Sequence, residues 1–262
     1  MSNQQTIQIP EIPGVSLVAY YGHKPLDLQQ LIVELQQLLL KSFAKNFLPY
    51  NLAQIHATII GCEGLKTESG IINKWFYNLR NEIKYIDYPG LLNYCLNSNI
   101  FPLNIFFGGY QNEINYQFLS RNLHPANRSF QLQTTKDNSL IPIINGWSVQ
   151  EQIITTDIYR VRHDLQKFNC LHKYHKFERE LDNDVYLRLG TIIGNFTPEL
   201  VATIQQEINH YLQHRKPTII DLDRENITVI KYQNLSLPTS TTEVYSLTEL
   251  HNNSKLIQWL YN

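Results

Sequence analysis

The segment QIHATIIGC occupies residues 54–62 and carries the most informative pattern in this chain. Its β-branched and apolar residues predict a β-strand. Successive side chains of a strand point to opposite faces, so His56 and Thr58 share one face and the apolar residues around them share the other. The strand therefore presents an imidazole and a hydroxyl together, either on the wall of a cleft or on an ordinary solvated face.

Segments typical of strands and helices alternate around this strand. Residues 15–22, VSLVAYYG, predict a strand that ends at a glycine. In residues 26–45, apolar side chains recur at spacings of three and four, which predicts an amphipathic helix. A second helix is predicted over residues 68–83. The order strand, helix, strand therefore leads into the H-x-T segment.

The rest of the chain continues the alternation. Thr197 and Pro198 have the residue types of a helix cap and a first helical position, so a helix is predicted from 198 onward. Another helix is predicted over residues 149–168. Further strands are predicted at 101–110, 115–120, 128–135, 140–146, 184–193, 217–222, 225–235 and 242–250.

This layout predicts an α+β protein. No linker rich in Pro, Gly or Ser divides the sequence, so residues 1–262 are expected to form a single bilobal domain. Strand, helix and strand elements occur in both halves. The approximate lobes are residues 15–110 and 111–250, and strands can be exchanged between them.

Composition restricts the partners and the compartment. Lys and Arg number 22 and Asp and Glu 23, so no global field favours nucleic acid or a membrane, and any anion site must be local. The cysteines Cys62, Cys95 and Cys170 are odd in number and far apart, which fits a reducing compartment and gives no zinc cluster. Without a signal-like or membrane-spanning apolar run, we expect a soluble cytoplasmic protein with no membrane or DNA partner.

The H-x-T pair suggests acid–base chemistry on a phosphate. Histidine can accept and donate protons near neutral pH, and a threonine hydroxyl two residues later can hold a phosphate oxygen beside it. Two such pairs facing each other across a cleft would supply a general base, a general acid and a phosphate clamp. Such a site needs no metal ion.

With this motif the chain resembles the 2H phosphoesterases, the LigT or RNA 2',3'-cyclic phosphodiesterase-like superfamily, whose signature is two H-x-T/S motifs on strands. The resemblance implies a bilobal fold in which two antiparallel sheets flank a central cleft with helices outside. It also implies cleavage of nucleotide or RNA cyclic phosphodiesters without metal or other cofactor. His56 and Thr58 would be the catalytic residues of the first motif.

The second motif departs from the family pattern. The strand in the corresponding place, residues 185–191, reads VYLRLGT and has Tyr186 where the family has histidine and Arg188 where it has threonine or serine. Residues 227–232 are the other candidate strand and also lack histidine. Arg188 would hold a phosphate through its planar cation, and Tyr186 would donate a hydrogen bond. Tyrosine, with an ordinary pKa near 10, is a poor general base.

Three hypotheses follow from this mismatch. The first is a divergent 2H phosphoesterase-like protein that binds a nucleotide or RNA phosphate and hydrolyses it slowly. The second is a catalytically inactive ligand-binding or partner protein on the same scaffold. The third is an unrelated α+β domain in which His56 is structural. A shared pocket for His56 and Arg188 would argue against the third.

Residues 170–180, CLHKYHKFERE, form a cluster with two readings. His172 and His175 have a helical metal-ligand spacing, but no acidic or cysteine partner at metal-site spacing accompanies them, so we expect a solvated surface and no metal site. The alternative is a basic patch for RNA phosphates with aromatic side chains to stack on bases. Glu178 and Glu180 mix the charge of such a patch.

Overall fold

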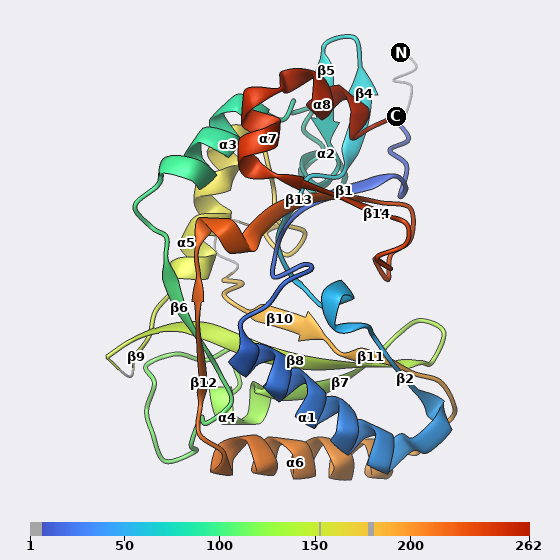
Figure 1. Ribbon diagram of the computed structural model, residues 1–262, viewed down its shortest axis with the longest axis vertical. Helices are drawn as coiled ribbons and strands as arrows, with labels where there is room; N and C mark the ends of the chain where they lie inside the picture. Colours follow the sequence, from blue (N-terminus) through green and yellow to red (C-terminus); the bar gives the residue numbers. More distant parts are fainter. Residues whose placement is uncertain (1–6, 152, 178–180) are drawn as a thin grey trace.

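Antiparallel sheets and surrounding helices build this protein in a computed structural model, which describes residues 7–151, 153–177 and 181–262 (Figure 1). The predicted α+β class is confirmed. The chain folds around two large sheets, and the described pairings within each of them are antiparallel.

The first sheet combines strands from distant parts of the sequence. Its order is β14-β13-β1-β3. The strands are β1 (Gly14–Ala19), β3 (Ala57–Gly61), β13 (Ile227–Tyr232) and β14 (Thr242–Ser246). Since β1 pairs with β3 on one side and with β13 on the other, the H-x-T strand forms an edge of this sheet.

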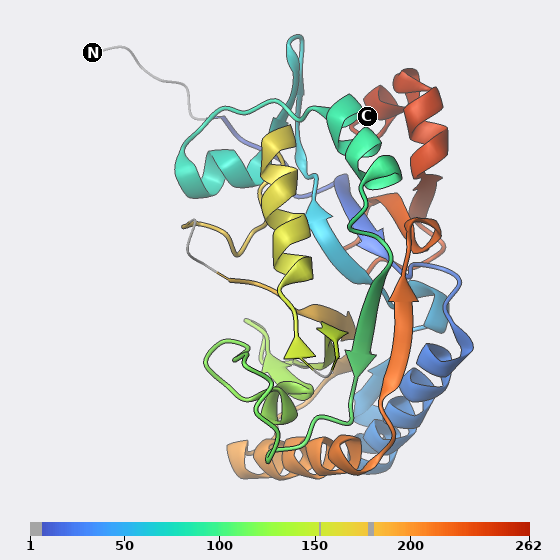
Figure 2. The same ribbon diagram turned by 90° about the vertical axis from the view of Figure 1, so that its left-hand side faces the viewer.

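The second sheet has the order β12-β6-β8-β11-β2, and three more strands pair with its longest strand, β8. Figure 2 shows β6 and β12 running side by side. The strands are β2 (Phe47–Pro49), β6 (Leu103–Phe107), β7 (Phe130–Thr134), β8 (Leu140–Gln150), β9 (Ile153–Ile154), β10 (Val185–Arg188), β11 (Gly190–Ile192) and β12 (Thr218–Leu222). Each large sheet thus contains strands from both expected halves, 15–110 and 111–250.

Helices cover the outside of the sheets. The long helices α1 (Leu26–Phe43) and α6 (Pro198–His214) lie at one end of the molecule and are joined by Glu34, which accepts a hydrogen bond from Tyr211 and pairs with Arg215 (Figure 1). The others are α2 (Lys74–Arg80), α3 (Tyr88–Asn97), α4 (Pro125–Arg128), α5 (Asp157–Asp164), α7 (Leu247–Asn252) and α8 (Ser254–Trp259). None of the described helices has the length and apolar character needed to cross a membrane.

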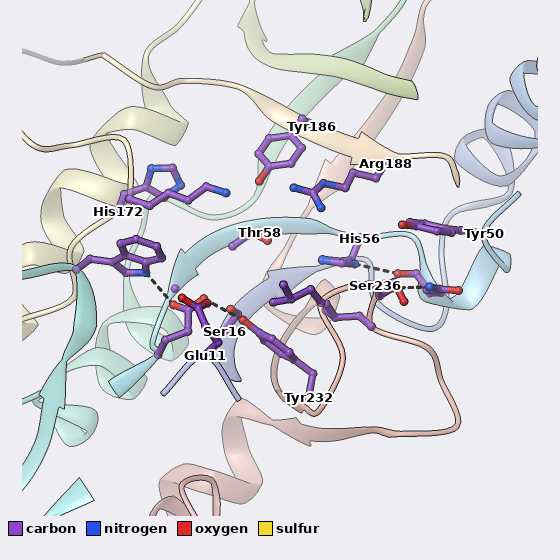
Figure 3. A pocket seen from close by; sticks show the side chains of 17 residues that line it. Glu11, Ser16, Tyr50, His56, Thr58, His172, Tyr186, Arg188, Tyr232 and Ser236 are labelled. Atoms are coloured by element: carbon purple, nitrogen blue, oxygen red, sulfur yellow. Dashed lines mark hydrogen bonds between the residues drawn. The ribbon is translucent and has the colours of Figure 1, made fainter. Parts of the chain in front are cut away.

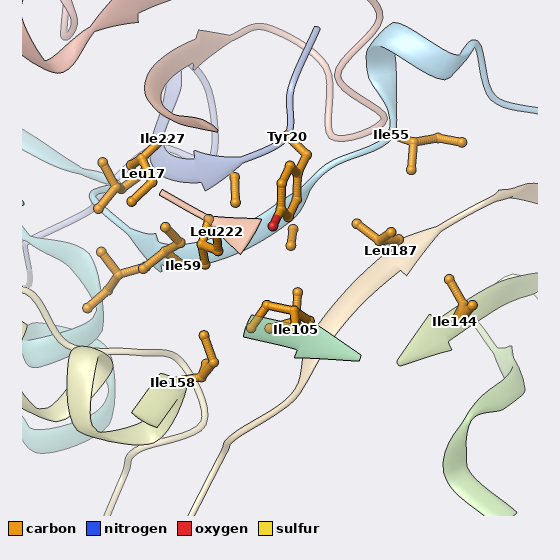
Figure 4. Close-up of a cluster of buried hydrophobic side chains, with 14 of the residues drawn as sticks. Leu17, Tyr20, Ile55, Ile59, Ile105, Ile144, Ile158, Leu187, Leu222 and Ile227 are labelled. Carbon is orange, nitrogen blue, oxygen red and sulfur yellow. The ribbon is translucent and has the colours of Figure 1, made fainter. Parts of the chain in front are cut away.

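One apolar core is shared by the two sheets. Figure 4 shows Leu17 and Ile59 of the first sheet in the same cluster as Ile105, Leu187 and Leu222 of the second. These side chains are 6% exposed or less. Burial of apolar surface between the sheets therefore fixes how β3 and β10 lie relative to each other.

Two predicted helices are wrong in part. In residues 68–83 the helix α2 begins only after Asn73, because β5 (Gly70–Asn73) pairs with β4 (Gly64–Thr67) as a small hairpin. The Asn73 side chain then accepts hydrogen bonds from the backbone amides of Trp75 and Phe76 in the first turn of α2. Ile71 and Ile72 are buried, so tertiary packing overrides the helical period seen in the sequence.

The helix predicted over residues 149–168 is shorter. β8 extends to Gln150 and pairs with β9, and α5 begins at Asp157; residue 152 lies outside the described part of the chain. The strand predicted at 115–120 does not form, and only Ser120 makes an isolated bridge there. The helix predicted from Pro198 is confirmed, with the Thr197 hydroxyl accepting from the amide of Leu200.

Candidate functional site

A pocket of about 260 Å³ lies between the two large sheets. The four residues predicted as a site all line it: His56 and Thr58 from the first sheet, Tyr186 and Arg188 from the second. Figure 3 shows Tyr186 and Arg188 on one wall, with Thr58 and His56 opposite them. The fold therefore brings these side chains together, while their chemical roles stay predictions.

Strand alternation explains this convergence. On β3 and the residues just before it, Ile55, Ala57 and Ile59 are buried, and His56 and Thr58 are half-buried. On β10, Val185 and Leu187 are buried, and Tyr186 and Arg188 are half-buried. In each case the apolar face packs into the shared core, so the polar face is left for the pocket.

The imidazole of His56 is held in one tautomer. Its Nδ1 lies 2.8 Å from the carbonyl oxygen of Gln54. Because a carbonyl oxygen only accepts hydrogen bonds, Nδ1 carries the proton, and the neutral ring keeps a lone pair on Nε2. The ring of Tyr21 packs edge-on against it at 5.8 Å. Nε2 is therefore the atom of His56 that can accept a proton from a ligand or a water.

Burial lowers the pKa of His56 to about 4. The hydrogen bond to Gln54 acts in the opposite direction, and the positive charges of Arg188 and Lys24 lower the pKa further. The effect of Arg188 is electrostatic, since like charges disfavour a second cation nearby. At neutral pH His56 is therefore uncharged, so the lone pair on Nε2 is available, and the low pKa makes the ring a weak base.

Arg188 is a cation with no carboxylate partner among the residues that the structure describes. Within the described part of the chain, its guanidinium makes no ion pair and no hydrogen bond. A planar guanidinium in this state can form two parallel hydrogen bonds to a phosphate or carboxylate. The wall formed by β10 is thus suited to bind an anion.

Lys173 is a second cation of the same pocket, and the sequence did not single it out. Burial lowers its pKa, but the neighbouring hydroxyls of Tyr186 and Tyr174 outweigh that effect, so the net pKa is raised. Its Nζ lies 4.9 Å from the ring centroid of Tyr174. In the sequence Lys173 belongs to the segment 170–180, for which a basic patch for RNA phosphates is the alternative reading, but its place in this pocket depends on tertiary structure.

The expectation that His172 and His175 are solvated is wrong. They are 2% and 1% exposed, and His172 lines the pocket. Nδ1 of His172 lies 3.2 Å from Oδ2 of Asp182, and burial holds the pKa of His172 well below its ordinary value. Glu178 and Glu180 lie outside the described residues. In the described part of the chain, no group of three or more His, Cys, Asp or Glu side chains could hold a metal ion.

Arg162 of α5 ties the two motif strands together. Its side chain, 1% exposed, donates to four backbone carbonyls. Two belong to β3, at Thr58 (2.9 Å) and Ile59 (3.0 Å), and two precede β10, at Asp182 (3.0 Å) and Asp184 (3.1 Å). This arginine fixes the spacing of the two walls without facing the ligand space itself.

The wall opposite β10 carries a carboxylate held by two aromatic residues. Glu63, which follows β3, accepts a hydrogen bond from Nε1 of Trp75 (2.8 Å) and another from the hydroxyl of Tyr232 (2.9 Å). All three line the pocket. The sequence gives no sign of this group, because residues 63, 75 and 232 come together only in the folded chain.

No known protein family model matches this chain, and neither does any curated protein.

Proposed function

We propose that this protein binds a nucleotide or RNA phosphodiester in the pocket between its sheets and hydrolyses it slowly, as a divergent 2H phosphoesterase with a bilobal fold. The observation that carries the proposal is the presence in one pocket of an uncharged His56, whose Nδ1 is engaged by Gln54, and of the cation of Arg188, which has no ion-pair partner among the described residues. A cyclic phosphate places an anion and a reacting phosphorus between two such groups.

The residues of the pocket supply the groups that hydrolysis of a cyclic phosphate needs. Arg188 and Lys173 hold the non-bridging phosphate oxygens, and the Thr58 hydroxyl donates to one of them. Nε2 of His56 takes a proton from a water whose oxygen attacks phosphorus. The bond from phosphorus to one ribose oxygen breaks, and that oxygen takes a proton from a solvent water, whose hydroxide is neutralised by the proton that His56 then releases. One water is consumed and a phosphomonoester is formed.

Slow turnover follows from the groups that could protonate the leaving oxygen. The β10 wall and its neighbourhood offer a tyrosine hydroxyl and an ammonium, and both are weak acids at neutral pH. His172 also lines the pocket, but burial and the charge of Arg162 keep its pKa low, so its ring is neutral rather than an acidic imidazolium at neutral pH. The site therefore supplies a base more readily than an acid.

The test compares hydrolysis of the four 2',3'-cyclic nucleotides by the wild-type protein, His56→Ala and His251→Ala. His251 is an exposed histidine on α7 and serves as a matched control. Loss of a general base typically costs about 10²- to 10⁴-fold, so His56→Ala should lose at least about 10²-fold in kcat while His251→Ala stays unchanged. Wild-type turnover by His56→Ala would overturn the catalytic proposal.

A second candidate is a ligand-binding protein without turnover. The presence of Tyr186 on β10, in place of a second proton-transferring imidazole, favours it. In that case the wild-type protein would bind cyclic nucleotides without hydrolysing them, and Arg188→Ala would weaken binding in calorimetry. Lys255→Ala, which removes an exposed cation on α8, should leave binding unchanged.

A further inference from the structure

Glu63 has acceptor capacity that the protein leaves unused. Each of its carboxylate oxygens accepts one hydrogen bond, Oε2 from Trp75 and Oε1 from Tyr232. No described Lys, Arg or His lies within ion-pair distance of it. A carboxylate has about four acceptor positions, so both oxygens of Glu63 can still accept from a ligand in the pocket.

Two glycines leave the space that this arrangement needs. A Cβ atom on Gly61 would lie 2.1 Å from Oε2 of Glu63 and 2.7 Å from Nε1 of Trp75. A Cβ atom on Gly14 would lie 2.1 Å from Cζ of Tyr232. A side chain at either position would displace the carboxylate or the aromatic residue that holds it. β1 and β3 therefore accommodate Glu63 in one fixed orientation.

The pocket has a positive and a negative side. Arg188 lies on one wall in Figure 3, and Tyr232, the hydrogen-bond partner of Glu63, lies on the opposite wall, with Thr58 between them. Among the described residues that line the pocket the other acid is Glu11, which is neutralised by Lys74 at 2.9 Å. Glu63 therefore supplies the unbalanced negative charge, and a matching ligand is anionic at one end and rich in hydrogen-bond donors at the other.

We propose that Glu63 determines specificity by accepting two adjacent donors, N1–H and the exocyclic N2 amine, from the guanine of the bound nucleotide. This inference rests on the proposed function. Among the common nucleobases guanine alone offers two donors side by side. In a 2',3'-cyclic phosphate both ribose hydroxyls are esterified, so the ribose cannot supply these donors instead. The half-buried indole of Trp75 offers a flat surface on which the purine can stack.

The test uses guanosine and inosine 3'-monophosphate, which differ only in the 2-amino group and cannot be hydrolysed as cyclic esters. Calorimetry should show that the wild-type protein binds the guanosine ligand about tenfold tighter, within the usual discrimination of a paired contact to a base. Glu63→Gln should reduce this preference to near one. Glu207→Gln, an exposed acid on α6, should keep it.

The outcomes separate this inference from the proposed function. If Arg188→Ala weakens both ligands and the wild-type protein shows no preference, the guanine contact is wrong and phosphate binding stands. If Arg188→Ala binds both ligands as the wild type does, the proposed function fails. A preference for guanosine that persists in Glu63→Gln would assign Glu63 a structural role and overturn the inference. The wild-type comparison needs no variant, so an absence of preference for guanosine overturns the inference even if Glu63→Gln does not fold.

Discussion

At the residue scale, the protonation of His56 is the property on which the proposed chemistry depends. The ring is uncharged because its partial removal from water disfavours the imidazolium, and because Arg188 and Lys24 place positive charge nearby. Arg188 thus has two effects on the site: it offers a binding group for an anion, and it disfavours protonation of the base. A bound phosphate would offset the second effect and raise the pKa of His56 in the complex.

We predict that NMR titration of the His56 ring gives a pKa near 4 in the wild-type protein. The pKa should rise in Arg188→Ala, because removing a nearby positive charge makes the imidazolium less unfavourable. His251, which is exposed, serves as the internal reference. A value near 6.5 for His56 in the wild-type protein, the ordinary histidine pKa, would contradict the burial that the structure assigns to it.

At the element scale, the two walls of the pocket depend on Arg162. We predict that Arg162→Met lowers the free energy of unfolding by about 3 kcal/mol or more, because four buried carbonyls lose their donor. Arg162→Lys should recover only part of this loss, since an ammonium cannot reproduce the fork of a guanidinium. Urea unfolding measures both effects.

Arg160→Met is the matched control for this prediction. Arg160 lies on the same helix, is 61% exposed and pairs with Asp157 across one turn. Exposed pairs of this kind contribute about 0.5 kcal/mol or less, so the control should unfold almost as the wild type does. Equal losses for Arg160→Met and Arg162→Met would contradict the role assigned to Arg162.

The elements also show which patterns in the sequence are sufficient for prediction. The apolar spacing of α1 and the capping residues of α6 are local signals, and both helices form as predicted. The alternation on β10 correctly placed Tyr186 and Arg188 on one face. Residues 68–83 gave the wrong element, because Ile71 and Ile72 obtain their burial from a hairpin and not from a helix. A local sequence pattern gives the wrong secondary structure where pairing with another strand determines which side chains are buried.

At the scale of the whole molecule, three histidines with lowered pKa values, the buried His172 and His175 and the half-buried His56, link stability to pH. Burial lowers the pKa of His56 and of His175 to about 4, and it lowers that of His172 well below the ordinary value. In the unfolded chain these rings titrate near 6.5. Between about pH 6.5 and 4 the unfolded state therefore binds more protons than the folded state, and stability rises with pH across this window.

We predict that the free energy of unfolding, measured with urea, falls steadily as the pH is lowered from 7 toward 4. His251→Gln, which removes an exposed histidine, should not change the slope. His175→Gln should reduce it, because one of the buried rings no longer titrates. A stability that is constant between pH 6.5 and 4.5 would show that these histidines are accessible to protons in the folded protein.

The sequence predicted only those residues of the candidate site that lie two apart on one strand and therefore share a face. His56 with Thr58, and Tyr186 with Arg188, each share a strand face, and the structure brings the two pairs to one pocket. Lys173 and Glu63 could not be found in this way. Their neighbours in the pocket come from other elements, so their positions depend on how the sheets and the segment before β10 pack together.

The pairing of β1 with β13 has a consequence for biosynthesis. More than two hundred residues separate Gly14 from its partner Tyr232 in the register of these two strands. While the ribosome is still translating the middle of the chain, β13 with Tyr232 has not been made. The edge of β1 that later pairs with β13 therefore has unpaired backbone groups. Contacts between such distant residues form slowly, so the nascent chain passes through a stage in which it needs protection from aggregation.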